Sequence, residues 1–396
     1  MHARAVCDSQ SFTGENNCAL FSYLLGMSVR LVRGALQASL KASSILRVLT
    51  PRSVPITRSF GLFSSNGKKE DEKESAHKEL REAVRELSQG LARPTTSSST
   101  SNLKDMDASP LSELEVDQLE ELARAHYEGE VDGSEASVTK AVEIWTEAAE
   151  RGSVESQYSL AICYREGNGI AKDANKAFKM MLELANKQPS GYHLAHYAVA
   201  VMFFENEGVE AAIGEAEREK QGFYHMKEAA RKGVLPALYN IGNCFSAGRG
   251  VKQSDHNAQL YYSAAVEAGD PAAKFTLGTW LVQGRGGLPQ DSDRAFTLQI
   301  EAAQAGHLPA AFNAGCHLMT GQGCEKDPEQ AAFWFEKAAE GNIMQACVNL
   351  ANMHREGLGV ERDLTKARNL VARFAATDAT CQQLMFKLDA EIAAEV

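Results

Sequence analysis

Long apolar runs, disulfide-type cysteine spacing and a catalytic constellation are all missing from this chain of 396 residues. No stretch of about 18 consecutive apolar residues occurs, so the sequence predicts no membrane-spanning helix. The eight cysteines are too few and too scattered to form a disulfide scaffold. No nucleophile, base or metal-ligand set stands at the spacing that catalysis requires, so the sequence predicts neither an enzyme nor a bound cofactor.

Acidic residues are also missing between Glu15 and Glu70, although the whole chain carries a net charge of −11. In that gap, Arg30, Arg33 and Lys41 fall on one face of a helical pattern and apolar side chains on another. A basic, serine-rich, amphipathic start is typical of a mitochondrial transit peptide. We therefore expect residues 1–60 to be a transit peptide, with Met27 as an alternative start and the mitochondrial matrix as the destination. The alternative is a basic tail or a surface-bound helix.

Removal of residues 1–60 would leave a strongly acidic protein with 34 basic and 50 acidic residues. Such a chain repels phosphate backbones, which argues against nucleic acid as a partner. We expect basic or neutral proteins as partners instead.

A unit of about 36 residues recurs through the second half of the chain. The first glycine of a G-x-G turn stands at Gly248, Gly284, Gly321 and Gly357, in steps of 36, 37 and 36 residues. Each unit has an apolar stripe before the turn, and after it an aspartate suited to start a second helix, followed by a pair of alanines for close packing. The aspartates are Asp255, Asp291, Asp327 and Asp363, and the alanine pairs include Ala302-Ala303 and Ala338-Ala339. A fixed period of this length predicts an array of stacked helix–turn–helix units.

The residues of these units resemble the Sel-1-like repeat, a glycine-rich relative of the tetratricopeptide repeat. The match is clear in Gly357-Leu358-Gly359-Val360 with Asp363, Lys366 and Ala367, and in the run Phe333 to Ala339. The similarity extends roughly from Leu114 to the C-terminus. It implies an all-α, right-handed α-solenoid of about seven repeats, and a role as scaffold or adaptor.

The segments around the array complete the expected domain organisation. We expect a charged amphipathic helix over 61–93, a disordered linker over 94–112, the repeat array over 113–378 and a capping helix over 379–396. The narrow apolar stripe within 68–92 suits either a solvated helix that docks weakly on the array or a short coiled-coil contact that supports weak self-association.

The third unit, from Tyr192 to Gly233, departs most from the pattern, because it lacks the G-x-G turn and is longer. His193 and His196 stand three residues apart, with His225 further along the unit, and two histidines on one helix face could begin a metal site. No nearby cysteine or obvious third ligand completes it, so no metal site is predicted. Cys316 and Cys324 stand eight residues apart in a later unit. Cysteine-rich members of the resembled family bridge such pairs, and whether these two pair is left open.

The first helix of each unit, helix A, carries a polar column just before its leucine–glycine position. In repeats of the resembled type, helix A lines the concave side, so this column would form a groove that binds a partner. The predicted groove residues are Ser159, Asn240, Asn243, Thr276, Thr279, Asn313, His317, Asn349 and Asn352. Side-chain amides can both donate to and accept from an extended peptide backbone. The alternative is a solvated surface that merely tolerates polar residues.

Together these features predict a non-enzymatic, protein-binding scaffold or adaptor in mitochondria, engaged in complex assembly or quality control. The alternative is an oligomerising mitochondrial stress-signalling component, because the resembled family includes a mitochondrial death-signalling protein of similar layout.

Overall fold

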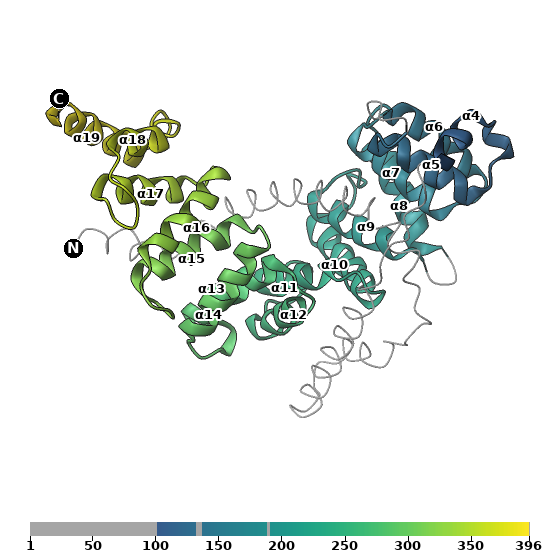
Figure 1. Cartoon of the computed structure of the whole chain (residues 1–396). Coiled ribbons are helices and arrows are strands. Elements are labelled where there is room, and N and C mark those ends of the chain that lie inside the picture. Colours follow the sequence, from purple (N-terminus) through teal and green to yellow (C-terminus); the bar gives the residue numbers. More distant parts are fainter. Residues whose placement is uncertain (1–100, 132–136, 188–190, 396) are drawn as a thin grey trace. The chain divides into compact units, whose positions relative to one another are not determined.

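The computed structural model describes residues 101–131, 137–187 and 191–395, and all regular structure in them is helical (Figure 1). These residues divide between Ser254 and Asp255 into an N-terminal and a C-terminal unit. The expected transit peptide at 1–60 and the charged helix at 61–93 lie outside the described residues. The all-α class and the array of helix–turn–helix repeats are confirmed.

The N-terminal unit holds eight α-helices in its described residues. They are α4 (Ser101–Ala108), α5 (Val116–Glu128), α6 (Val138–Glu150), α7 (Val154–Glu166), α8 (Ala174–Asn186), α9 (His193–Glu205), α10 (Glu215–Arg231) and α11 (Pro236–Ala247), with a short 3₁₀ turn, η2 (Leu111–Glu113). From α5 onward, odd-numbered helices are helix A of a repeat and even-numbered helices are helix B.

The C-terminal unit continues the same alternation in its described residues. Its helices are α12 (Asp255–Glu267), α13 (Pro271–Gln283), α14 (Ser292–Gln304), α15 (Leu308–Thr320), α16 (Pro328–Glu340), α17 (Met344–Glu356), α18 (Leu364–Ala372) and α19 (Ala379–Glu395), with the 3₁₀ turn η3 (Arg285–Gly287) after α13. The division between the units therefore falls inside the fourth repeat, between its helix A and its helix B.

The second glycine of each turn brings successive repeats into close contact. A Cβ atom on Gly323 would lie 2.0 Å from the carbonyl oxygen of Ser292, the first residue of helix B in the preceding repeat. No side chain fits at that distance, so only glycine allows this approach. The third repeat achieves the same contact without a G-x-G turn. There Asn206 takes the left-handed conformation, with φ of 55°, and Gly208 approaches Ala174.

The recurring aspartates begin helix B in most of the repeats, as expected. Asp291, Asp327 and Asp363 each accept a hydrogen bond from the backbone N–H three residues later, at 2.7 to 2.9 Å. Such caps satisfy backbone donors that have no partner inside the helix. Asp255 differs, because its carboxylate accepts two hydrogen bonds from Arg285, each at 2.9 Å. In that repeat the aspartate joins neighbouring repeats.

The alanine pairs are buried between neighbouring helices. Ala338 and Ala339 of α16 are buried beside Phe335 in a core cluster that includes side chains of α15 and α17. Their small side chains let the helix backbones approach one another, as expected from the sequence.

The prediction of a disordered linker over 94–112 is wrong from residue 101 onward. Helix α4 begins at Ser101, and its Leu103 and Met106 are buried against Leu119 and Leu122 of the first repeat. Two apolar side chains three residues apart suffice to dock this short helix, because the first repeat otherwise leaves an apolar face uncovered.

Candidate functional site

Each helix A turns one face toward its own helix B. In α15 this face contains Gly315, where a Cβ atom would lie 2.6 Å from the Phe335 ring of α16. A residue two positions earlier lies roughly 200° around the helix, since 3.6 residues complete a turn. Asn313 therefore points away from α16. The same relation holds in α13, where Gly278 faces α14 and Thr276 lies two positions earlier.

The C-terminal unit contains the predicted groove residues whose amides are free. Asn313, Asn349 and Asn352 are half-buried and make no side-chain hydrogen bond within the described part of the chain. Thr276 and Thr279 are also half-buried. Thr279, however, donates to the carbonyl oxygen of Phe275 at 3.0 Å, so its hydroxyl is engaged within its own helix.

The helices α13, α15 and α17, which carry these predicted groove residues, have few charged side chains. Helix α15 has no charged residue, and α13 has only Lys274, which pairs with Glu301 of α14 at 2.7 Å. The charged residues of α17 are Arg355 and Glu356 at its end, and they pair with each other at 2.6 Å. A face of amides without net charge can hydrogen-bond a peptide backbone without selecting for charged side chains.

The predicted groove residues of the N-terminal unit are engaged within the fold. Ser159 is buried and donates to the carbonyl oxygen of Glu155 at 3.0 Å. Asn240 of α11 donates to the hydroxyl of Tyr197 of α9 at 3.0 Å, and so links two successive helices A. Asn243 is half-buried and also has an interaction partner. These contacts make the N-terminal unit a poorer candidate for binding an extended partner.

His317 does not belong to the groove, and its prediction as a groove residue is wrong. Its side chain is buried, and its Nδ1 lies 2.6 Å from the carbonyl oxygen of Gln322 in the following turn. Burial lowers the pKa of His317, which favours the neutral ring. His354 makes the same type of contact with Glu361 at 3.0 Å in the next repeat. Both histidines tie helix A to its turn.

Two of the three histidines of the atypical third repeat meet in its core. His196 of α9 and His225 of α10 are buried, with their Nδ1 atoms 3.0 Å apart. Burial lowers the pKa of each to about 4, so the pair is neutral and one ring donates to the other. No group of three or more metal-ligating side chains lies together among the described residues.

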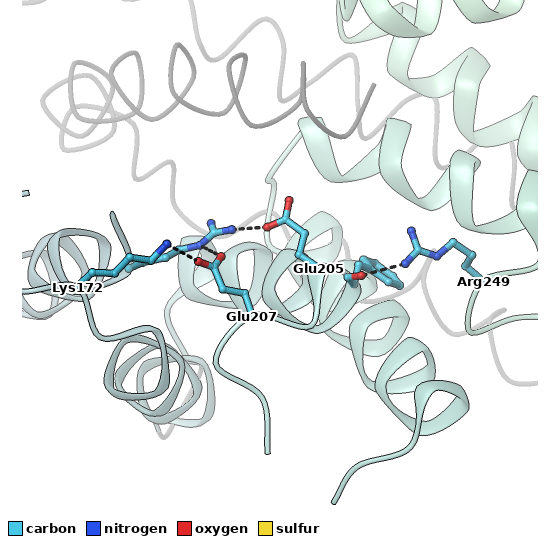
Figure 2. Close-up of polar contacts among 6 residues, drawn as sticks. Lys172, Glu205, Glu207 and Arg249 are labelled. Atoms are coloured by element: carbon cyan, nitrogen blue, oxygen red, sulfur yellow. Dashed lines mark hydrogen bonds and ion pairs between the residues drawn. The ribbon is translucent and has the colours of Figure 1, made fainter. Parts of the chain in front are cut away.

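Charged residues at the end of α9 join the third repeat to its neighbours (Figure 2). Arg165 of α7 donates to Glu205 at 2.5 Å and to Glu207 at 2.6 Å. Figure 2 shows Lys172 approaching Glu207, at 3.6 Å. Beyond Glu205 in the same view lies Arg249, which donates to the carbonyl oxygen of Phe204 of α9 at 3.1 Å. Arg249 also pairs with Glu219 of α10 at 3.0 Å. These charges hold successive repeats together, and the sequence pattern gave no indication of their pairing.

The sequence left open whether two cysteines pair, and it predicted no membrane-spanning helix. Cys316 and Cys324 are both half-buried, and they form no disulfide with each other in the described part of the chain. Among the helices that the structure describes, none is long and apolar enough to cross a membrane.

Comparison with known proteins places the chain among repeat proteins. The Sel1 repeat model matches seven times, at residues 119–153, 154–188, 193–234, 235–270, 271–307, 308–343 and 345–376. A Sel1 repeat protein from Oxalobacter formigenes has a similar solved structure, with a TM-score of 0.57 and 21% identity, over 86% of this chain and 95% of that one. This structural likeness supports the fold alone.

Two curated relatives have informative names. Chitin synthase regulator SKT5 of Saccharomyces cerevisiae is 27% identical over 58% of this chain and 38% of its own length. Cytochrome c oxidase assembly factor 7A of Xenopus laevis is 28% identical over 24% of this chain and 43% of its own length. The matched region thus spans less than half the length of either relative.

Proposed function

Because the chain belongs to the Sel1 repeat family, we propose that it is a non-enzymatic protein-binding scaffold or adaptor of mitochondria. Its role would be in complex assembly or quality control. The binding surface is the face of α13, α15 and α17 that points away from helix B, and its central residues are Asn313, Asn349 and Asn352. The occupant is a partner protein or an extended segment of one.

One observation carries the proposal, namely the three amides that have no hydrogen-bond partner within the described residues. Asparagine is only a middling helix former, so its recurrence on two successive helices A is not explained by helix stability. Each amide offers a donor and an acceptor, which match the groups of a peptide backbone.

The names of the relatives support a role exerted through other proteins. One is called a regulator and another an assembly factor, and neither name describes a catalytic activity. The mitochondrial part of the proposal rests on the basic, acid-poor residues 1–60.

Replacement of Asn313, Asn349 and Asn352 by alanine tests the function. Each amide hydrogen bond contributes a net ~0.5–1.5 kcal/mol, so the triple variant should bind its partners roughly a hundredfold more weakly. The free protein should be no less stable, because alanine is the better helix former. The measurement is quantitative affinity capture from isolated mitochondria beside thermal unfolding.

Asn369→Ala is the matched control, because Asn369 is an exposed asparagine on α18, a helix B. Unchanged capture by the triple variant would show that the amides are only solvated surface. A sharp fall in its melting temperature would instead show that they hold the array together.

A further inference from the structure

Helix α19 continues the packing register of the two helices A before it. The buried residues of α19 are Cys381, Leu384 and Leu388. Among their larger buried sets, α15 buries Ala311, Ala314 and Leu318, and α17 buries Cys347, Leu350 and His354. These three sets of residues have the same spacing, and α17, α18 and α19 share one core cluster. In this register Gln383 of α19 takes the position of Asn313 and Asn349, and Phe386 takes that of Asn352.

Phe386 is exposed without a packing reason of its own. Its side chain is 61% exposed, more than the other exposed large apolar side chains of the described residues. Leu384 and Leu388 already bury the inner face of α19, so its docking on the array does not need a phenylalanine here. Large exposed aromatic side chains are frequent anchors of protein interfaces.

Lys387 stands beside Phe386 and is exposed, whereas His317 and Met353, which occupy its position in α15 and α17, are buried. Gln383, Phe386 and Lys387 share one helix face, because they are three and four residues apart. Lys387 forms no ion pair with another described residue. The end of the groove therefore offers one apolar contact and one positive charge, after a stretch of uncharged amides.

We propose that the binding groove extends over α19 and ends at Phe386 and Lys387, where it accepts an apolar side chain next to a carboxylate. The occupant is an extended protein segment that is uncharged where it crosses Asn313 and Asn349. This inference rests on the proposed function and adds the chemistry of the partner. Phe386 supplies affinity through apolar burial, and Lys387 selects for an acidic neighbour.

A display library of random linear peptides, selected on the full chain, tests this inference. Peptides enriched on the wild type should share an aromatic or aliphatic residue next to Asp or Glu, and few other charges. Phe386→Ala should weaken the selected peptides by about tenfold or more, the loss expected for an interface anchor. Lys387→Glu should shift the preference at the neighbouring position from Asp or Glu to Lys or Arg.

Phe333→Ala is the matched control, because Phe333 is 50% exposed but lies on α16, a helix B. It should leave peptide binding unchanged, and circular dichroism should show all variants folded.

The outcomes separate this inference from the proposed function. Peptides weakened by Asn349→Ala but not by Phe386→Ala would leave the groove intact and overturn the extension. Peptides insensitive to both substitutions, or no peptide enriched on the wild type, would overturn both. A dimeric wild type together with a monomeric Phe386→Ala variant would also overturn the inference, because a second copy of the chain would then cover Phe386.

Discussion

His196 and His225 show how one pair of side chains makes the third repeat sensitive to pH. The two rings are buried in contact, with Nδ1 atoms 3.0 Å apart, and Lys232 lies near enough to oppose protonation of His196. The pKa of each histidine in the folded protein is about 4, because burial disfavours the charged ring. In the unfolded chain the value is about 6.5.

We therefore expect stability to be complete above about pH 6.5 and to fall as the pH drops toward 4. In that window the unfolded chain binds protons that the folded pair does not. Protonation therefore stabilises the unfolded state and lowers the free energy of unfolding by roughly a few kcal/mol. Urea unfolding across the window measures the loss.

His225→Gln should flatten this dependence, since glutamine can still hydrogen-bond but does not titrate. His256→Gln, at an exposed position of α12, should leave the pH dependence as it is. Equal curves for wild type and His225→Gln would show that other groups carry the acid sensitivity.

At the scale of the helical element, contact between repeats depends on the second turn glycine. Gly323 has φ of 73°, and a Cβ atom there would lie 2.0 Å from the Ser292 carbonyl oxygen. Gly306, which closes the preceding repeat, has φ of 86° but no atom within 4 Å of such a Cβ. The two glycines share the conformational requirement, and only Gly323 has the close neighbour.

Gly323→Ala should therefore cost more stability than Gly306→Ala. Both substitutions place a side chain in the left-handed region, at roughly 1–2 kcal/mol, and the first adds a backbone clash of about 1–3 kcal/mol. Chemical unfolding gives the difference, and hydrogen exchange should rise first in α14 and α15, because repeats contact only their neighbours. Equal costs would mean that the repeats can separate slightly without loss.

At the scale of the whole molecule, the sequence combines an acidic repeat array with a basic first segment of opposite character. Residues 27–60 fused to a reporter should carry it into mitochondria in a manner that depends on the membrane potential. Replacement of Arg30, Arg33 and Lys41 by glutamate removes the positive charge that the negative matrix potential attracts, and import should be lost. Import assays with isolated mitochondria measure this, and a variant that still enters would contradict the transit peptide.

The sequence alone determined the features that repeat or act locally. The period of the turn glycines predicted the helix pairs, and the alanine pairs predicted close packing, because both are set by residues within a single repeat. Most of the aspartate caps followed for the same reason, since a cap and its helix lie three residues apart. The exception, Asp255, is engaged by an arginine from the next repeat.

Only the tertiary structure decided which polar side chains are free. Asn240 and Asn313 occupy the same position in their repeats, yet Asn240 bonds Tyr197, 43 residues earlier in the chain. The sequence predicted His317 as a groove residue, but its ring is buried against the following turn. The exposure of Phe386 likewise depends on how α19 packs on α17 and α18. Contacts between repeats join residues far apart in sequence, and a local pattern cannot contain them.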